Sequence, residues 1–155
     1  MLVFLANDVN LLTKEAIMKG KTVYELQVGD SEIYERTVTE ADVAMFGGVS
    51  GDQNPAHFNE VYAKGTMFKG RVVHGMLTAS YFSTILGTLM PGPGTIYLGQ
   101  DLKFTKPVRV QDTIKAVATI TEVNQEKNII KLETIAYNQN GDIVVKGIAT
   151  VMPPK

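Results

Sequence analysis

The most apolar helical stretch of the chain is GMLTASYFSTILGTL, residues 75–89. Apolar side chains recur in it at intervals of three and four residues, namely Met76, Leu77, Ala79, Phe82, Ile85, Leu86 and Leu89. This spacing predicts one helix of about fifteen residues, roughly 22 Å long. The Pro91-Gly92-Pro93-Gly94 run that follows is expected to end the helix.

Strand patterns dominate the sequence after this helix. Four stretches alternate or are rich in β-branched and aromatic residues: 97–104, 113–123, 128–137 and 143–151. Asn140-Gly141 is a strong hairpin signal between the last two. One helix packed against several antiparallel strands predicts an α+β fold in which a curled antiparallel sheet wraps around one long central helix.

A strand and short helices are expected before residue 75. Residues 31–38 are typical of a strand. Thr39, with Asp42 three residues later, indicates the capped start of a helix. The Gly47-Gly48 pair is expected to end that helix, and residues 57–64 are expected to form a further short helical piece.

Composition limits the classes of function. The chain has 155 residues, 45% hydrophobic and 20% charged, which predicts a single globular domain. A formal net charge of −1 gives no reason to expect a nucleic-acid partner. The absence of cysteine excludes disulfides and thiolate chemistry, and two histidines are too few for a His-rich metal site, so no metal is expected.

The N-terminal residues 1–17 are interpreted as an extension of unknown role, followed by one domain over residues 18–155. Met1–Leu12 is apolar, but Asn7 and Asp8 interrupt it and no basic residue precedes it. It therefore fits neither a secretory signal nor a membrane span. We expect a cytoplasmic protein with no membrane partner.

The residues with catalytic potential lie between Ser50 and Gly75, in SGDQNPAHFNEVYAKGTMFKGRVVHG. Asp52 precedes His57 by five residues, with an Asn54-Pro55 turn between them. Gly75 stands at the start of the long helix, directly after the second histidine, His74. An acid, a base and a helix N-terminus are the parts of a proton-transfer site next to a carbonyl.

Each of these residues also has an ordinary structural explanation. Asp52 alone fits an Asx-turn, and His57 alone fits a half-buried core histidine. His74 is expected to orient the start of the helix rather than to transfer protons.

Two motifs resemble one known family. GDQNPAH (51–57) followed by FKGRVVHGML (68–77) is similar to the MaoC-like, (R)-specific enoyl-CoA hydratases with the hotdog fold. YLGQDLKFTKPV (97–108) also resembles a strand of these proteins, and the likeness extends from Tyr24 to Val151.

The resemblance implies a reaction and an assembly. The reaction is the reversible addition of water to a trans-2-enoyl-CoA, which gives a (3R)-3-hydroxyacyl-CoA. Asp52 and His57 would activate the water, and the backbone N–H of Gly75 would polarise the thioester carbonyl. The family also implies a homodimer with the two sheets joined edge to edge. No cofactor is expected, because the coenzyme A thioester is the substrate.

The chemistry is consistent with these roles. Water needs a base as it adds to the β-carbon, and the enolate that develops needs a preorganised donor. A glycine at position 75 lets a carbonyl approach the backbone closely. Which of Asp52 and His57 is the base is left open by the sequence.

Four further residues are expected to contact substrate. Ser83 and Leu86 would face the acyl tunnel, Phe46 would border the acyl chain, and Arg71 would meet the nucleotide phosphates. Lys103, Lys106 and Arg109 are further cations that could do so.

Three alternatives remain open at this point. A 3-hydroxyacyl-carrier-protein dehydratase would use the same chemistry on a different thiol carrier. A hotdog thioesterase would attack the thioester carbon instead of the β-carbon. A non-catalytic acyl-CoA-binding module would need neither Asp52 nor His57.

Overall fold

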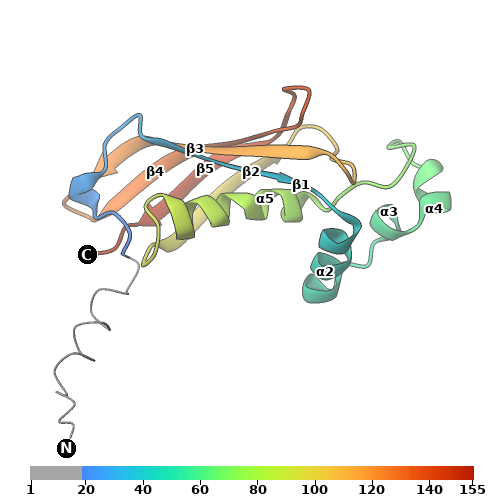
Figure 1. Ribbon diagram of the computed structural model, residues 1–155, viewed down its shortest axis with the longest axis horizontal. Coiled ribbons are helices and arrows are strands. Elements are labelled where there is room, and N and C mark those ends of the chain that lie inside the picture. The colour runs from blue at the N-terminus through green and yellow to red at the C-terminus, as the bar shows by residue number, and fades with distance from the viewer. Residues whose placement is uncertain (1–18) are drawn as a thin grey trace, which may run out of the picture.

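A five-stranded antiparallel sheet forms one side of the molecule in the computed structural model, which describes residues 19–155. Its strands are β1 (Ser31–Thr37), β2 (Ile96–Phe104), β3 (Thr113–Asn124), β4 (Ile129–Tyr137) and β5 (Ile143–Met152). Their order across the sheet is β1-β3-β4-β5-β2, so β1 and β2 are the edges (Figure 1). The proposed extension, residues 1–17, lies outside the described residues.

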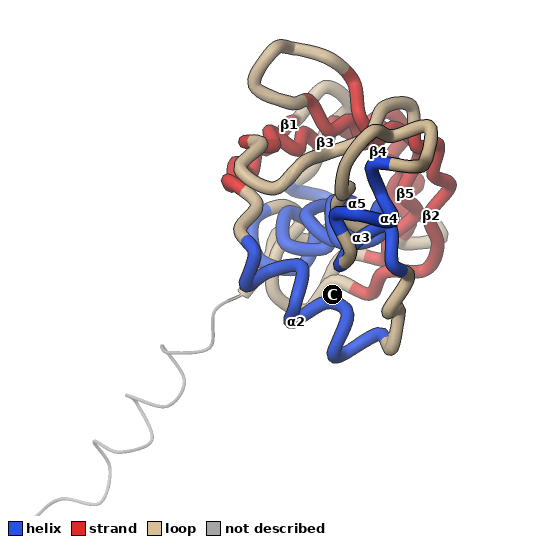
Figure 2. The backbone as a smooth tube through the Cα atoms, turned by 90° about the vertical axis from the view of Figure 1, so that its right-hand side faces the viewer, coloured by secondary structure: helices blue, strands red, loops and turns tan. Residues whose placement is uncertain are grey.

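The sheet curls around the helix α5 (Gly75–Thr84), as the view along the helix shows (Figure 2). This confirms the predicted α+β architecture. The four strands expected after the helix and the strand before it all form, with ends within a residue or so of those predicted.

The core lies between α5 and the concave face of the sheet. Alternate residues of the central strands are fully buried there, among them Ile114, Ile120, Ile130 and Leu132. Phe82 of α5 is 0% exposed and packs against them in the same cluster. Burying one such side chain contributes about 1.5–3 kcal/mol, so this layer supplies most of the stability.

The long apolar helix runs as predicted to Leu89, but its winding changes on the way. After Thr84 it continues as a turn of π-helix, η2 (Ile85–Leu89), in which the Met90 N–H donates to the Ile85 carbonyl. The apolar spacing of three and four residues tolerates this widening, because Ile85 and Leu86 still face the core.

Three short helices connect β1 to α5 and lie beyond the end at which α5 begins (Figure 1). They are α2 (Glu40–Ser50), α3 (Pro55–Phe58) and α4 (Glu60–Lys64); a short turn of helix, η1 (Val23–Glu25), precedes β1. The predicted cap of α2 is confirmed, since the Asp42 N–H donates to Thr39 Oγ1 and the Thr39 N–H donates back to Asp42 Oδ2.

Two predicted boundaries in this region are wrong. Helix α2 continues through Gly47 and Gly48 to Ser50 and ends at Gly51, whose φ of +76° is left-handed. Gly47 serves packing instead, because a Cβ there would lie 2.5 Å from the Phe58 ring. The expected helical piece 57–64 is two helices, since Asn59 leaves the helical conformation and caps α4 by accepting from the Tyr62 N–H.

Candidate active site

A cavity of about 620 Å³ opens where α2 and α3 meet the first turn of α5. Its walls come from distant parts of the chain: Asp52 and His57, the start of α5, Phe104 of β2 and Val145 of β5. The lining is mostly apolar, with a few polar groups gathered at the start of α5. This is the composition expected of a site for a ligand with an apolar part and one reacting end.

Asp52 uses its two carboxylate oxygens differently. Oδ1 accepts the Asn54 N–H at 3.1 Å, which is the Asx-turn that the residue alone would predict. Oδ2 lies 3.9 Å from Nε2 of His57. The structural and the chemical interpretation of Asp52 are therefore compatible, because each takes one oxygen.

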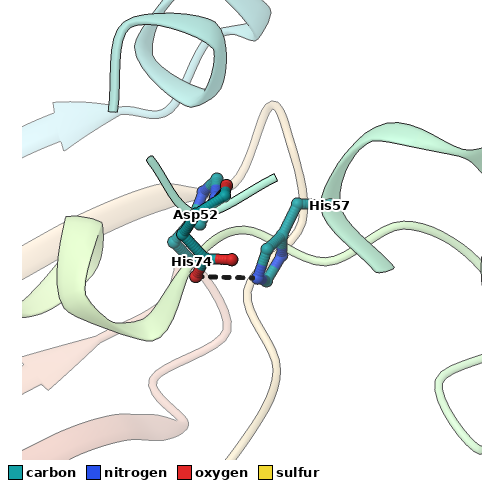
Figure 3. Close-up of side chains that lie close together, drawn as sticks. All are labelled: Asp52, His57 and His74. Carbon is teal, nitrogen blue, oxygen red and sulfur yellow. Dashed lines mark hydrogen bonds and ion pairs between the residues drawn. The ribbon is translucent and has the colours of Figure 1, made fainter. Parts of the chain in front are cut away.

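His57 is held in one tautomer by the main chain. It sits on α3, which begins with Asn54 accepting the Ala56 N–H and with Pro55 in the first turn. Its Nδ1 is 2.7 Å from the Val72 carbonyl oxygen, which can only accept, so Nδ1 carries the hydrogen. Its other ring nitrogen, Nε2, lies on the side of Oδ2 of Asp52 (Figure 3).

His74 and Gly75 bring the start of α5 to the same place. His74 is the N-cap residue of the helix and is 1% exposed. Its ring centroid lies 3.8 Å from that of His57, and its Nε2 lies 3.0 Å from the Asp52 carbonyl oxygen. Gly75 opens the helix, so its N–H has no intrahelical acceptor and faces the end with partial positive charge.

Space at Gly75 is limited by an aromatic ring. A Cβ at this position would lie 2.8 Å from Cε1 of Phe104, which also lines the cavity. Glycine fits here without displacing the Phe104 ring, which any side chain at this position would have to move.

Of the other residues predicted to contact the acyl chain, one lines the cavity and two do not. Phe46 lines the cavity, with its ring 5.0 Å from that of His74. Ser83 is exposed, Leu86 is 1% exposed within the core, and neither lines this cavity. Helical periodicity identified Leu86 as inward-facing but could not distinguish core from tunnel.

Most of the predicted phosphate-binding cations have protein partners. Arg71 forms ion pairs with Glu40 and, at 3.8 Å, with Glu60. Lys106 pairs with Asp142 at 2.6 Å. The Arg109 guanidinium donates to three main-chain carbonyl oxygens, those of Phe68, Gly70 and Arg71. These bonds connect Arg109 to the loop before α5.

Thr78 was missed by the sequence analysis. It lines the cavity, is 1% exposed, and its hydroxyl has no hydrogen-bond partner among residues 19–155. It follows Gly75 by three residues, so helical spacing puts both on one face of α5. Phe104 and Val145 were missed too, and only the pairing of β2 with β5 brings them to the site.

Asp52, His57 and His74 form a cluster that could be considered as a metal site, although the sequence has only two histidines. Each offers a ligand atom within 4.8 Å of the others. Ligands about 2.1 Å from an ion would lie at most about 4.2 Å apart, which is less than this spread. The donor set fits proton transfer better than metal binding.

No helix within residues 19–155 has the length and apolar character needed to cross a membrane.

The chain is similar to proteins of one family, by its match to a domain model and by its relatives. The model of the MaoC like domain matches residues 27–140. The (R)-specific enoyl-CoA hydratase of Rhodospirillum rubrum is 45% identical over 84% of this chain and 90% of its own length. The (R)-specific enoyl-CoA hydratase of Aeromonas caviae is 41% identical over 83% of this chain and 96% of its own.

A solved structure extends the likeness to the fold. The unliganded R-hydratase of Pseudomonas aeruginosa superposes with a TM-score of 0.82 at 42% identity, covering 88% of this chain and 87% of that one. The expected hotdog fold is thereby confirmed.

Proposed function

Because this chain belongs to the MaoC-like domain family, we propose that it is an (R)-specific enoyl-CoA hydratase, a hydro-lyase. It adds water reversibly to a trans-2-enoyl-CoA and forms a (3R)-3-hydroxyacyl-CoA. The observation that carries the proposal is the placing of Asp52 Oδ2 and His57 Nε2 3.9 Å apart beside the first turn of α5, with His57 Nδ1 held by the Val72 carbonyl.

One water molecule fits between the two side chains. A water oxygen about 2.8 Å from each acceptor spans a 3.9 Å separation with a bent arrangement of its two hydrogens. In this role His57 Nε2 takes a proton as the water oxygen bonds to the β-carbon. The other hydrogen stays on the water oxygen and donates a hydrogen bond to Asp52 Oδ2, which orients the attack. The pair returns a proton to the α-carbon, so that one water is added in total.

The Gly75 N–H stabilises the charge that develops. As the β-carbon is attacked, the electrons of the double bond move towards the thioester oxygen, which becomes an enolate. A free N–H at a helix N-terminus is a preorganised donor for that oxygen, and such a donor contributes about 3–4 kcal/mol to a transition state.

The substrate is an acyl-CoA, and no cofactor takes part in this proposal. The apolar cavity would hold the acyl chain, with Phe46 on its wall. The predicted roles of Ser83, Leu86 and Arg71 remain predictions. None of the three lines this cavity, so each could contact only a part of the substrate that lies outside it. Coenzyme A thioesters are made and used inside cells, which makes the cytoplasm the proposed location.

We also propose a homodimer joined through the edge strand β2. The edge is unpaired in the protomer, and its side chains Ile96, Leu98 and Phe104 are about half exposed. Antiparallel pairing with a second β2 would satisfy the free backbone groups and cover this apolar surface.

The alternatives have less support. A thioesterase needs its nucleophile at the thioester carbon, whereas the relatives at 41–45% identity are hydratases. A carrier-protein dehydratase shares the mechanism and differs in the thiol carrier. A binding module has no use for a base with a fixed tautomer.

The test follows the loss of conjugation of trans-2-butenoyl-CoA with the wild type and with Asp52→Asn. The product is then offered to dehydrogenases specific for the R and S hydroxyacyl forms. Hydration to the R product, lost in the variant, supports the proposal. Release of free thiol without hydration indicates a thioesterase. Faster reaction of the matched carrier-protein thioester indicates the dehydratase.

A further inference from the structure

His74 contacts both members of the proposed catalytic pair. Its Nε2 lies 3.0 Å from the main-chain carbonyl oxygen of Asp52, and its ring centroid lies 3.8 Å from that of His57. The two rings are tilted by 34° to one another and lie in van der Waals contact. The proposed mechanism gives His74 no role, although its side chain lies close to those of Asp52 and His57 (Figure 3).

The direction of the hydrogen bond is fixed by chemistry. The Asp52 carbonyl oxygen can only accept, so Nε2 of His74 carries the hydrogen and donates it. The neutral ring then has its lone pair on Nδ1, and that atom is buried without a partner among residues 19–155. His74 therefore has the opposite tautomer to His57, whose hydrogen is on Nδ1.

The surroundings leave His74 no room to move. Phe46 and Phe58 flank it with ring centroids 5.0 Å and 5.6 Å away. Phe58 is itself pressed against Gly47, where no Cβ would fit. A side chain that is 1% exposed and enclosed by three rings holds its one polar contact in a fixed direction.

The same residue also precedes the proposed oxyanion donor. His74 is the N-cap of α5, its carbonyl accepts the N–H groups of Leu77 and Thr78, and its peptide bond leads to the Gly75 N–H. One rigid residue thus fixes the turn that carries Asp52, the ring of His57 and the start of the helix.

We infer that His74 is a positioning residue of the proposed hydratase. It holds Asp52 through its main chain and His57 through its ring, so that Oδ2 and Nε2 stay at the spacing that one water can bridge. The inference rests on the proposed function. A misplacement of about 1 Å in such a pair can lower turnover about a hundredfold, so a contact that maintains the spacing matters for the reaction.

Two substitutions separate the contacts that His74 makes. His74→Phe keeps an aromatic ring for stacking and removes the donor. His74→Gln keeps an amide donor near the place of Nε2 and removes the ring. Val43→Ala is the matched control, because Val43 is 1% exposed in the core of α2 and its loss weakens packing without touching the pair.

The measurements are kcat and KM for trans-2-butenoyl-CoA, with each variant also combined with Asp52→Asn. We expect His74→Phe to lower kcat at least about tenfold, with KM changed less than about threefold. The fall in kcat should be smaller in His74→Gln. Because His74 acts through the pair, adding His74→Phe to the Asp52→Asn variant should lower kcat little further. Val43→Ala should leave kcat within about twofold.

The outcomes distinguish the inference from the proposed function. If wild type does not hydrate the substrate, the proposed function fails and the inference fails with it. If wild type is active and His74→Phe has a kcat within about twofold of it, or if the losses in the double variant multiply in full, only the inference is overturned. Should His74→Phe not fold, the same two comparisons are made with His74→Leu, which also removes the donor.

A structural readout is independent of activity. In a crystal structure of the His74→Phe variant we expect Oδ2 of Asp52 and Nε2 of His57 to lie at a spacing clearly different from 3.9 Å. An unchanged spacing would overturn the positioning role.

Discussion

The sheet with α5 and the connecting segment 39–74 are held together in different ways. The first buries an apolar cluster that includes Phe82, Ile114 and Leu132 at 0% exposure. The second leaves large apolar side chains in the open, with Val49 and Met67 at 91% and 85% exposure. Val43 and Val73 anchor it to the core, and its short helices are held by caps and by hydrogen bonds.

Those polar contacts are local and specific. Thr39, Asn54 and Asn59 each cap a short helix, and Arg109 binds three carbonyl oxygens of the loop that leads to α5. Apolar burial is non-directional and supplies stability, whereas hydrogen bonds fix direction. The comparison teaches that the stability of the fold and the geometry of the site can be changed separately.

The largest expected effect is on stability, from Phe82→Ala. Phe82 is 0% exposed in the core, so the cavity left behind should lower the free energy of unfolding by about 3–5 kcal/mol. Urea unfolding measures this. The folded fraction should keep its kcat, and a matching loss of kcat would contradict the separation of core and site.

The converse variants are Asp52→Asn and His57→Ala. Each should lower turnover at least about a hundredfold, because each removes a group that handles the proton. The melting temperature should stay nearly unchanged in Asp52→Asn, since the amide oxygen of the new side chain can still accept the Asn54 N–H. A fall of more than about 5 °C in either variant would mean that the pair supports the fold.

Gly75→Ala is expected to act at the boundary of the two regions. Its methyl group would meet the Phe104 ring at 2.8 Å and crowd the N–H that faces the substrate. We expect kcat/KM to fall about tenfold or more. Gly48→Ala is the control, because its Cβ meets nothing within 4 Å and should stabilise α2 by about 0.5–1 kcal/mol. Equal activity in the two variants would remove Gly75 from the site.

Asp42 should make the connecting segment sensitive to acid. Burial raises the pKa of its carboxyl, but hydrogen bonds from Thr39 and Arg36 outweigh burial and hold the pKa below its usual value. A lowered pKa means that the stabilisation is complete above about pH 4, the unfolded value, and is lost as the pH falls through the folded one.

Asp42→Asn should therefore reduce the dependence of stability on pH below about pH 4. At pH 7 it should lower the free energy of unfolding by about 1.5–3 kcal/mol. Urea unfolding from pH 7 to 3 measures both. Glu126→Gln is the control, because Glu126 is exposed and has no ion pair within residues 19–155. The same slope in both variants would contradict the prediction.

The smallest expected effect compares two buried threonines. Thr78 has a hydroxyl without a partner among residues 19–155, whereas Thr134 accepts a hydrogen bond from Gln100 Nε2 at 3.0 Å. Thr78→Val should leave stability unchanged or raise it by about 1 kcal/mol, and Thr134→Val should lower it by about 0.5–1.5 kcal/mol. Urea unfolding of both variants measures the difference. A loss of stability in Thr78→Val would show that its hydroxyl is satisfied in solution.

The amino-acid sequence by itself determined the elements and the place of the chemistry. The spacing of apolar residues from Met76 to Leu89 predicted the central helix, and alternation predicted the strands, because both patterns arise from local backbone geometry. Asp52, His57 and Gly75 were identified from short motifs, and the structure brings them to one cavity.

The tertiary structure decided what depends on contacts between distant residues. Only the pairing of β2 with β5 brings Phe104 beside Gly75. Only the packing of α3 against the loop before α5 gives His57 its tautomer, through the Val72 carbonyl. Arg71 and Arg109 looked like phosphate ligands until their carboxylate and carbonyl partners were known. A sequence pattern records which way a residue faces along its own helix or strand, but the partner across the fold determines what its polar atoms do.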